Sequence, residues 1–338
     1  MNATDITTAE KHLRDILALA IEYRPPHAAL VVWDAHCDLA ITLTEAYRRC
    51  LPDAVFINFD SVAAETVRAK FARLAPGDLV VLIQSTSFRL DAFRIRVEFF
   101  KLALKVIEHP HLSRMPGAEA SLYIASLAYD PAYFRGVGNA LKARIDKAKV
   151  AIIASGGEQL VFASGFEPAK LNIGDYRNMN NVGGQFPIGE VFTESLDLEA
   201  VNGRVRIAIF GDTSFTVNKP AQPITLVVSK GRVIEAIAST PEFDQVLANI
   251  RAEEGEVWLR ELGFGLNRAF TQERTVSDIG TFERMCGIHL SLGAKHGSYN
   301  KPNIRRAEAK YHVDVFAATG TVTLDDEVVY RDGSWLVC

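Results

Sequence analysis

The sequence predicts an α/β amino-terminal lobe with a mostly parallel sheet, followed by a β-rich α+β carboxy-terminal lobe. The chain has 338 residues, which is enough for two domains with substantial cores. Short apolar runs alternate with helical patterns as far as about residue 160, and beyond it short β-prone runs are separated by Gly, Asn and Pro. We therefore place an α/β domain at residues 1–160 and a β-rich domain at residues 161–338.

The amino-terminal lobe begins with a helix over residues 8–23. Thr7-Thr8-Ala9-Glu10 has the spacing of a capping box, apolar residues then recur at helical intervals, and Arg24-Pro25-Pro26 ends the pattern. Strands joined by helical crossovers form parallel sheets with helices on both faces. The strands are expected at residues 28–33, 54–59, 79–84 and 150–154, and the helices at residues 38–50, 61–74, 91–107 and 132–147.

The carboxy-terminal lobe has the pattern of an antiparallel β structure. Its β-prone runs are short and close together, and one helix, over residues 241–253, interrupts them. The runs cover residues 205–210, 224–228, 232–238, 312–316 and 321–324.

Composition excludes several classes of function. The net charge of −4 lacks the basic excess that binding to nucleic acid needs, and no apolar run approaches the ~18 residues of a membrane span. The four cysteines are scattered, which argues against structural zinc and a disulfide framework. Charged Asp5, Glu10 and Lys11 stand where a secretory signal would need an apolar core. We expect a soluble, cytoplasmic protein.

Two further motifs are interpreted as turns. Ser155-Gly156-Gly157-Glu158 follows a predicted strand but lacks the rest of a dinucleotide or nucleotide fingerprint. Trp33-Asp34-Ala35-His36-Cys37-Asp38 lies at a strand end, where α/β sheets often place ligand groups. It has no nucleophile motif around it, so a capped turn with a hydrogen-bonded His is favoured over a catalytic Cys/His pair.

The densest set of potential metal ligands lies between residues 261 and 314. His312 and Asp314 are two apart, so in a strand both side chains project from one face and can reach a single ion. His289 lies between Ile288 and Leu290 in an alternating run that turns its imidazole to one face. Each His is also compatible with an ordinary hydrogen-bonded role.

Two carboxylates strengthen the metal interpretation. Glu261 precedes Gly263-Phe264-Gly265, where the backbone can pass close to a bound group, and Glu190 follows Gly189. The alternative is that both carboxylates are solvated residues at a helix end and a turn. Together, two His and three carboxylates form a mixed nitrogen and oxygen ligand set suited to Zn²⁺, Mn²⁺, Co²⁺ or Fe²⁺.

These motifs resemble those of the thermophilic metallo-aminopeptidases, the aminopeptidase T type of leucyl aminopeptidase. The similarity covers about residues 180–338 and, in general architecture, the amino-terminal lobe. The matching segments, in the family's order, are Gly189-Glu190-Val191-Phe192-Thr193, Glu261-Leu262-Gly263-Phe264-Gly265-Leu266-Asn267, Gly287-Ile288-His289-Leu290-Ser291-Leu292-Gly293 and His312-Val313-Asp314.

The resemblance implies a two-metal site with Zn, Co or Mn, held by the five ligands already named. Glu190 would bridge the ions, one ion would activate water, and the other would polarise the scissile carbonyl of a small peptide or amide. A homodimer is also implied. The family's motif has a tyrosine where this chain has His296, which is either a ligand, donor or base at the site or a residue of a solvated loop.

Two alternatives stay open. The related 2,5-dihydroxypyridine dioxygenases open a ring with one non-haem Fe(II), and His289, His312 and Asp314 fit a two-His-one-carboxylate set. Five hard ligands are more than such a site needs, which favours the hydrolase. The other alternative is a non-catalytic protein that binds a peptide or assists a biosynthetic pathway, with a structural metal or none.

Overall fold

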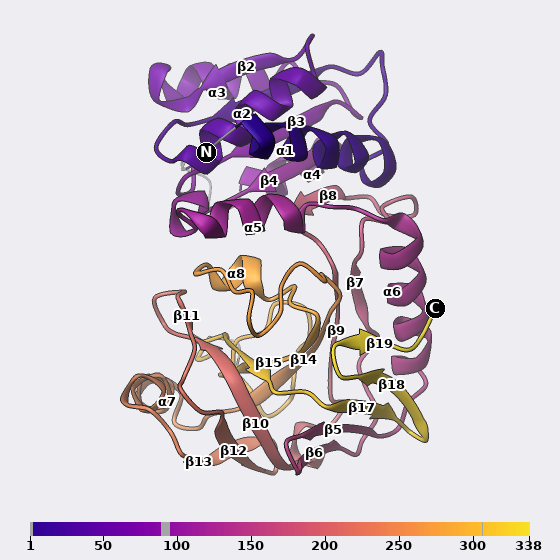
Figure 1. The fold of residues 1–338 in the computed structure, drawn as a ribbon, viewed down its shortest axis with the longest axis vertical. Coiled ribbons are helices and arrows are strands. Elements are labelled where there is room, and N and C mark those ends of the chain that lie inside the picture. The colour runs from indigo at the N-terminus through magenta and orange to yellow at the C-terminus, as the bar shows by residue number, and fades with distance from the viewer. Residues whose placement is uncertain (1–2, 89–94, 306) are drawn as a thin grey trace. The chain divides into compact units, whose positions relative to one another are not determined.

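The computed structural model describes residues 3–88, 95–305 and 307–338. The chain forms two compact units. Unit 1 comprises Met1–Phe134 and Gly174–Ile188, and unit 2 comprises Arg135–Ile173 and Gly189–Cys338. Unit 1 contains a parallel sheet and unit 2 an antiparallel sheet, which confirms the predicted combination of α/β and β-rich structure (Figure 1).

The sheet of unit 1 has five parallel strands in the order β2-β1-β3-β4-β8. The alternation of the first three strands with helices follows the predicted pattern, because each of these apolar runs is too short for a helix and is rich in branched residues. The strands are β1 (Ala29–Trp33), β2 (Val55–Asn58), β3 (Leu79–Ile83), β4 (Lys105–His109) and β8 (Val182–Gln185).

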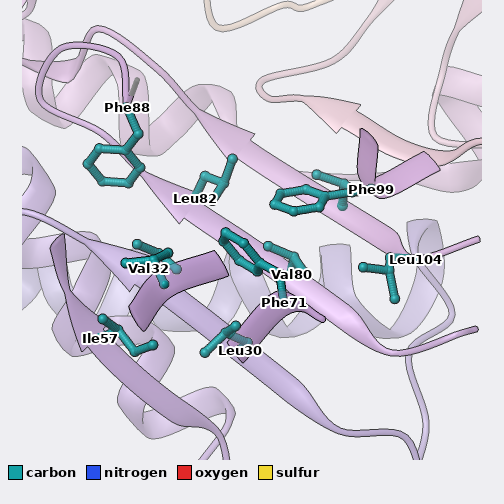
Figure 2. Close-up of a cluster of buried hydrophobic side chains, with 11 residues drawn as sticks. Leu30, Val32, Ile57, Phe71, Val80, Leu82, Phe88, Phe99 and Leu104 are labelled. Carbon is teal, nitrogen blue, oxygen red and sulfur yellow. The ribbon is translucent and has the colours of Figure 1, made fainter. Parts of the chain in front are cut away.

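Helices supply the rest of the core of unit 1. Phe71 and Phe99 pack with Val80 and Leu82 in one buried cluster (Figure 2). Each buried aromatic side chain contributes about 2–3 kcal/mol through the hydrophobic effect. The helices are α1 (Ala3–Asp15), continued by a π-helical turn (Ile16–Ala20), α2 (Asp38–Cys50), α3 (Ala64–Phe71), α4 (Ile95–Lys101) and α5 (Ala118–Ser126), with short 3₁₀ turns at Phe59–Ser61 and Leu112–Arg114.

The helix predicted over residues 91–107 is wrong in its second half. Residues 91–94 lie outside the described residues, α4 ends at Lys101, and β4 follows almost at once. Ala103 has a positive φ of 54°, a conformation that stops a helix. Buried Val106 and Ile107 then pair with β3, so their apolar character reflects a strand covered on both faces.

One predicted strand belongs to a different sheet from the one expected, and one strand of the parallel sheet was not predicted. The strand predicted at 150–154 exists as β5 (Ala151–Ser155), but it pairs antiparallel within unit 2. The fifth parallel strand, β8, comes from a segment with no apolar pattern. A Cβ at Gly183 would lie 1.9 Å from the carbonyl oxygen of Val106. Glycine is therefore required where β8 meets β4, and it leaves no side-chain periodicity to detect.

Unit 2 is built on a fourteen-stranded antiparallel sheet. The main path of strands is β19-β18-β17-β5-β6-β10-β16-β15-β14-β9-β7. Off this path, β11 and β12 pair with β10, and β13 pairs with β12. Its strands, besides β5, are β6 (Glu158–Phe162), β7 (Lys170–Asn172), β9 (Glu190–Glu194), β10 (Val201–Gly211), β11 (Val217–Asn218), β12 (Ile224–Ser229), β13 (Arg232–Ile237), β14 (Leu259–Gly265), β15 (Gly287–Leu292), β16 (Val313–Ala317), β17 (Thr321–Leu324), β18 (Glu327–Arg331) and β19 (Ser334–Trp335).

The helices and turns confirm several predictions. Thr240 caps α7 (Pro241–Glu254), the predicted single helix of the β-rich region, by accepting a hydrogen bond from the Phe243 amide. Gly156 and Gly157, both with positive φ, form the turn between β5 and β6. The other helices are α6 (Pro131–Ile145) and α8 (Ile279–Phe282), with a 3₁₀ turn at Leu198–Ala200. No helix in the described ranges has the length and apolar character that crossing a bilayer requires.

Candidate metal centre

Four neighbouring strands of unit 2 carry the predicted ligands. In the order β9, β14, β15 and β16, each strand pairs with the next. One face of these strands therefore collects polar side chains that are far apart in sequence. Glu190 lies in β9, Glu261 in β14, His289 in β15 and Asp314 in β16, while His312 directly precedes β16.

The central strands are buried on both faces, so the polar side chains lie in an apolar surrounding. Every residue of β14, β15 and β16 is buried. A break in register between Leu259 and Leu262 marks a β-bulge against β15, and there the Glu261 amide donates to Ser291 Oγ at 3.0 Å. Bulges of this kind redirect a side chain without breaking the sheet. The bulge thus sets the position of the Glu261 carboxylate.

The first ligand group consists of Glu190, Glu261 and His289. Nε2 of His289 lies 3.2 Å from Glu190 Oε1 and 3.2 Å from Glu261 Oε1. All three side chains are less than one-tenth exposed. Buried carboxylates need compensating charge, either from a cation or from protons on the imidazole.

The second ligand group consists of Glu261, His312 and Asp314. His312 Nε2 lies 3.2 Å from Asp314 Oδ1, and His312 Nδ1 donates to the carbonyl oxygen of Lys295 at 3.1 Å. A hydrogen bond at the second nitrogen is the usual way to orient a metal-binding His, because it fixes the tautomer and leaves Nε2 for the ion. His312 is the most exposed of the group, at 30% of its side chain, so access to this group is from its side.

Glu261 belongs to both groups, and this differs from the expectation for Glu190. The resemblance implied that Glu190 would bridge two ions, whereas Glu261 is the carboxylate whose oxygen atoms lie within reach of all the other ligand atoms in both groups. Glu190 contributes to the first group alone. A bridging role therefore fits Glu261 better.

His296 lies against the same carboxylate. Its Nε2 is 2.7 Å from Glu261 Oε2, its Nδ1 accepts from the Ser298 amide at 3.1 Å, and its side chain is 2% exposed. Because Nδ1 accepts a hydrogen bond, the proton of the neutral ring is on Nε2. His296 is thereby a hydrogen-bond donor to Glu261.

Arg284 is a site residue that sequence reasoning missed. Its Nη1 lies 3.3 Å from Glu190 Oε2 and also contacts Glu283, and its Nε is buried without a hydrogen-bond partner. Arg284 is 5% exposed and follows the short helix α8. It belongs to no motif and has no periodic position, so only the folded chain shows that it is next to Glu190.

Without a metal, the imidazole and the carboxylates of the first ligand group form ion pairs. Burial opposes ionisation of Glu261, but hydrogen bonds from His289 and His296 outweigh it, so the pKa of Glu261 lies well below its usual range. Burial likewise opposes protonation of His289, but hydrogen bonds to Glu190 and Glu261 raise the pKa of His289 to about 10.

The second group behaves in the same way. Burial lowers the pKa of His312. The nearby charges of Asp314 and Glu261, together with the hydrogen bond to the Lys295 carbonyl, outweigh burial and raise that pKa to about 9. Asp314 Oδ1 is buried and makes no hydrogen bond, and the same is true of His289 Nδ1. In both groups imidazolium protons stand where a cation would lie, and binding of a metal would release them.

The residues present fit a divalent metal. With neutral imidazoles, three buried carboxylates face one guanidinium, which leaves an excess of negative charge. Oδ1 of Asp314 is buried, makes no hydrogen bond of good geometry and lies 3.2 Å from His312 Nε2, so it can accept an ion once that imidazole is neutral. Carboxylate oxygens with imidazole nitrogens are the donors that Zn²⁺, Mn²⁺, Co²⁺ and Fe²⁺ accept.

The fold and these ligand groups define a candidate metalloprotein. The structure is similar to that of 2,5-dihydroxypyridine dioxygenase from Pseudomonas putida KT2440, with a TM-score of 0.65 and 14% identity over 98% of this chain and 97% of that chain. It is also similar to wild-type AmpT from Thermus thermophilus, with a TM-score of 0.57 and 15% identity over 98% of this chain and 99% of that chain. No protein-family model matches the sequence, and no curated protein matches it. At such low identity these similarities establish the fold relationship alone.

Proposed function

We propose that this protein is a metal-dependent hydrolase that cleaves a peptide or amide bond. The observation that carries the proposal is the sharing of Glu261 by two ligand groups, because a shared carboxylate is the feature of sites that hold two ions close together. The likeness of the fold to AmpT supports the same class of reaction. The substrate would be a small peptide or an aminoacyl amide.

At such a site a divalent metal supplies activation of water and polarisation of a carbonyl. The chain's own residues then orient the reactants and move the protons. Glu190 Oε2 faces Arg284, so Oε1 is the atom that can bind an ion or accept a proton from the attacking water. Nε2–H of His296 donates to Glu261 Oε2 at 2.7 Å, so it would hold the shared carboxylate in one orientation for binding the ions.

A ring-opening dioxygenase with one Fe(II) is the second candidate. The likeness to the dioxygenase, with a TM-score of 0.65, favours it. The ligand set argues against it, because among the described residues His289 does not group with His312 and Asp314, the three residues that a two-His-one-carboxylate site would use. The third candidate, a non-catalytic binding or accessory protein, would need neither a metal-dependent reaction nor the hydrogen bond that His296 donates.

Metal analysis of protein purified without chelator tests the proposal. The expected result is about two Zn, Mn or Co ions per chain together with hydrolysis of aminoacyl amides. About one Fe per chain together with O₂ uptake on 2,5-dihydroxypyridine would instead establish the dioxygenase. Absence of both metal and turnover would leave the binding role.

A further inference from the structure

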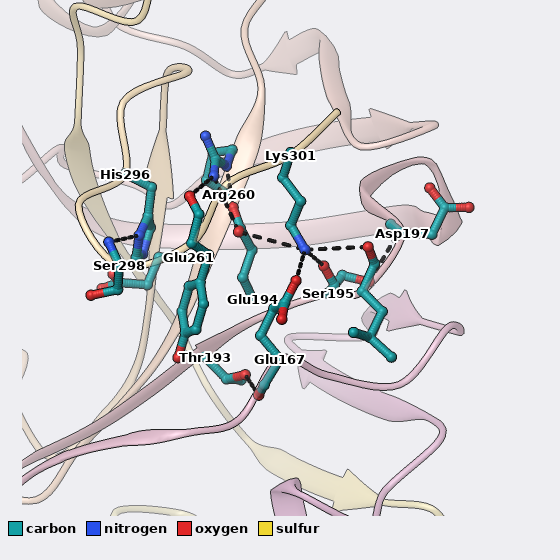
Figure 3. Close-up of polar contacts among 12 residues, drawn as sticks. Glu167, Thr193, Glu194, Ser195, Asp197, Arg260, Glu261, His296, Ser298 and Lys301 are labelled. Atoms are coloured by element: carbon teal, nitrogen blue, oxygen red, sulfur yellow. Dashed lines mark hydrogen bonds and ion pairs between the residues drawn. The ribbon is translucent and has the colours of Figure 1, made fainter. Parts of the chain in front are cut away.

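A buried network of charges lies beside the metal centre in unit 2 (Figure 3). Arg260 Nε pairs with Glu194 Oε1 and Arg260 Nη2 with Glu194 Oε2 at 3.1 Å. Lys301 Nζ lies 2.6 Å from Glu167 Oε1 and 3.7 Å from Glu194 Oε2. The side chains of Arg260, Glu194 and Lys301 are at most 3% exposed. Two cations face two anions, so the network is balanced without a metal.

One guanidinium holds both ends of the turn that carries His296. We call residues 294–299 the His296 turn. Arg260 donates through Nη1 to the carbonyl oxygen of Ala294 and through Nη2 to that of Tyr299, at 3.2 Å. The two carbonyls bracket His296, and Arg260 is the residue directly before Glu261 in β14. The anchor of the turn and the shared carboxylate are therefore on the same short piece of strand.

Lys301 fixes the chain directly after the His296 turn. Its Nζ donates to the carbonyl oxygens of Ser195, at 2.6 Å, and Leu196, at 3.2 Å. These carbonyls follow the end of β9, the strand in which Glu190 lies. Lys301 and Arg260 together thus fix the turn against the two strands that carry Glu190 and Glu261.

The energetics of buried ion pairs favour a positional role. Removing charges from water costs about as much as their attraction returns, so replacing a whole pair by apolar residues of similar volume is often neutral or stabilising. The network is therefore weak evidence for stability. What an apolar replacement cannot supply is the fork of directed N–H groups that reaches two carbonyl oxygens at once.

We infer that Arg260, with Glu194 and Lys301, is a positioning device that holds His296 as a fixed Nε2–H donor at the metal centre. The inference deepens the proposed hydrolase and rests on it for the effect of His296 on turnover. Glu194 orients the guanidinium, the guanidinium fixes Ala294 and Tyr299, and the fixed turn lets the Ser298 amide hold Nδ1 of His296.

The test is a double variant, Arg260→Met with Glu194→Leu, which removes this ion pair as a whole and leaves Lys301 paired with Glu167, so no buried charge is left unpaired. In metal-free protein at pH 8 we expect amide exchange of Lys295 and Ser298 to rise on the order of tenfold. The side-chain ¹⁵N signals of His296 should change from a single Nε2–H tautomer to an average of two. In the metal-loaded protein, kcat should fall about 10–100-fold while KM changes less.

The control is Arg144→Met with Glu327→Leu, an ion pair in the same unit in which Arg144 Nε donates to both carboxylate oxygens and whose partners are 33% and 53% exposed. It should change none of the readouts. Arg260→Lys is a second test if the double variant does not fold, because one ammonium group cannot reach both carbonyls, and the same rise in exchange is expected. Unchanged exchange together with a single His296 tautomer in either variant would overturn the positioning role. Exchange and tautomer are measured without metal or turnover, so they remain decisive even if the parent proves not to be a hydrolase.

Discussion

Gly263 of β14 is paired with His289 of β15, and the imidazole occupies the space that a side chain at position 263 would need. A Cβ on Gly263 would lie 2.0 Å from both Nε2 and Cε1 of His289. Nε2 is also the atom that faces Glu190 and Glu261. The glycine is thus part of the construction of the metal centre, because it makes room for a ligand on the neighbouring strand.

Gly263→Ala should therefore displace the His289 imidazole and lower metal affinity about 10–100-fold, since the ring would lose its alignment with the first ligand group. Isothermal titration with Zn²⁺ or Co²⁺ measures the effect. Gly136→Ala is the matched control, because Gly136 lies in α6 and a Cβ added there would meet nothing within 4 Å. The control should bind metal like the parent and gain roughly 0.5–1 kcal/mol in stability. Equal affinities for parent and Gly263→Ala would remove the glycine from the construction of the site.

The sharing of Glu261 predicts unequal effects of two similar substitutions. Glu261→Gln should impair both ligand groups, whereas Glu190→Gln should leave Glu261, His312 and Asp314 able to hold one ion. Metal titration should show about two ions for the parent, about one for Glu190→Gln and weak binding of both for Glu261→Gln. Glu199→Gln is the control, because Glu199 is a partly exposed carboxylate that pairs with Arg232 away from the ligand groups. The reverse ranking would make Glu190 the shared ligand.

Arg284 predicts a link between metal binding and stability. Arg284→Met removes one of the two cationic neighbours of the buried Glu190 carboxylate and leaves the His289 imidazolium, which should lower the free energy of unfolding of the metal-free protein by about 1–3 kcal/mol. Saturating metal should restore part of this loss, because a ligand that binds only the folded state stabilises it. Urea unfolding with and without Zn²⁺ measures both quantities.

The control for this substitution is Arg305→Met. Arg305 pairs with Glu308 at the surface, where both side chains are more than half exposed, so its loss should cost at most about 1 kcal/mol with or without metal. A destabilisation by Arg284→Met that metal does not reduce would mean that Arg284 supports the fold rather than the centre.

Local patterns were enough to predict the strands and helices whose side chains carry a clear period. The strand at Leu79–Ile83 and the helices Asp38–Cys50 and Pro241–Glu254 lie where the sequence indicated. Strand β8 was not predictable, because Gly183 and Gly184 have no side chains from which a period could be recognised. Strand β4 was not predictable either, because a short buried run after a helix has a composition that fits both a strand and a continuation of the helix.

The candidate site shows the same division. His289, His312 and Asp314 were recognisable because ligand types recur at strand spacing, and the folded chain groups them with Glu190 and Glu261 on adjacent strands or, for His312, directly before one. Arg284 lies next to Glu190 because of the strand order and the loop after α8, and neither of these leaves a local signal in the sequence. The bulge that selects Glu261 as the shared carboxylate is likewise a property of pairing between strands, not of one strand.

Buried His109 in unit 1 predicts a dependence of stability on pH. Its Nε2 is 2.9 Å from Tyr47 Oη and its Nδ1 is 2.8 Å from Tyr123 Oη, and Tyr123 donates onward to the carbonyl oxygen of Phe186 at 3.0 Å. Because the Tyr123 proton goes to Phe186, Nδ1–H of His109 donates to Tyr123 and Nε2 accepts from Tyr47. Both nitrogens are satisfied only when the ring is neutral.

Burial lowers the pKa of His109 from 6.5 to about 3. The unfolded chain therefore takes up a proton as the pH falls below about 6.5 while the folded chain does not, so stability is full above that pH and declines as the pH falls toward about 3. At pH 5 the loss from this group should be about 2 kcal/mol. Urea unfolding at pH 7 and pH 5 measures the effect. His109→Gln should be less stable than the parent at pH 7, and between pH 7 and pH 5 it should lose about 2 kcal/mol less stability than the parent loses. His27→Gln, which replaces an imidazole that is 42% exposed, is the control at the surface. If His109→Gln lost as much stability between pH 7 and pH 5 as the parent does, protonation of this buried ring would not be what destabilises the protein in acid.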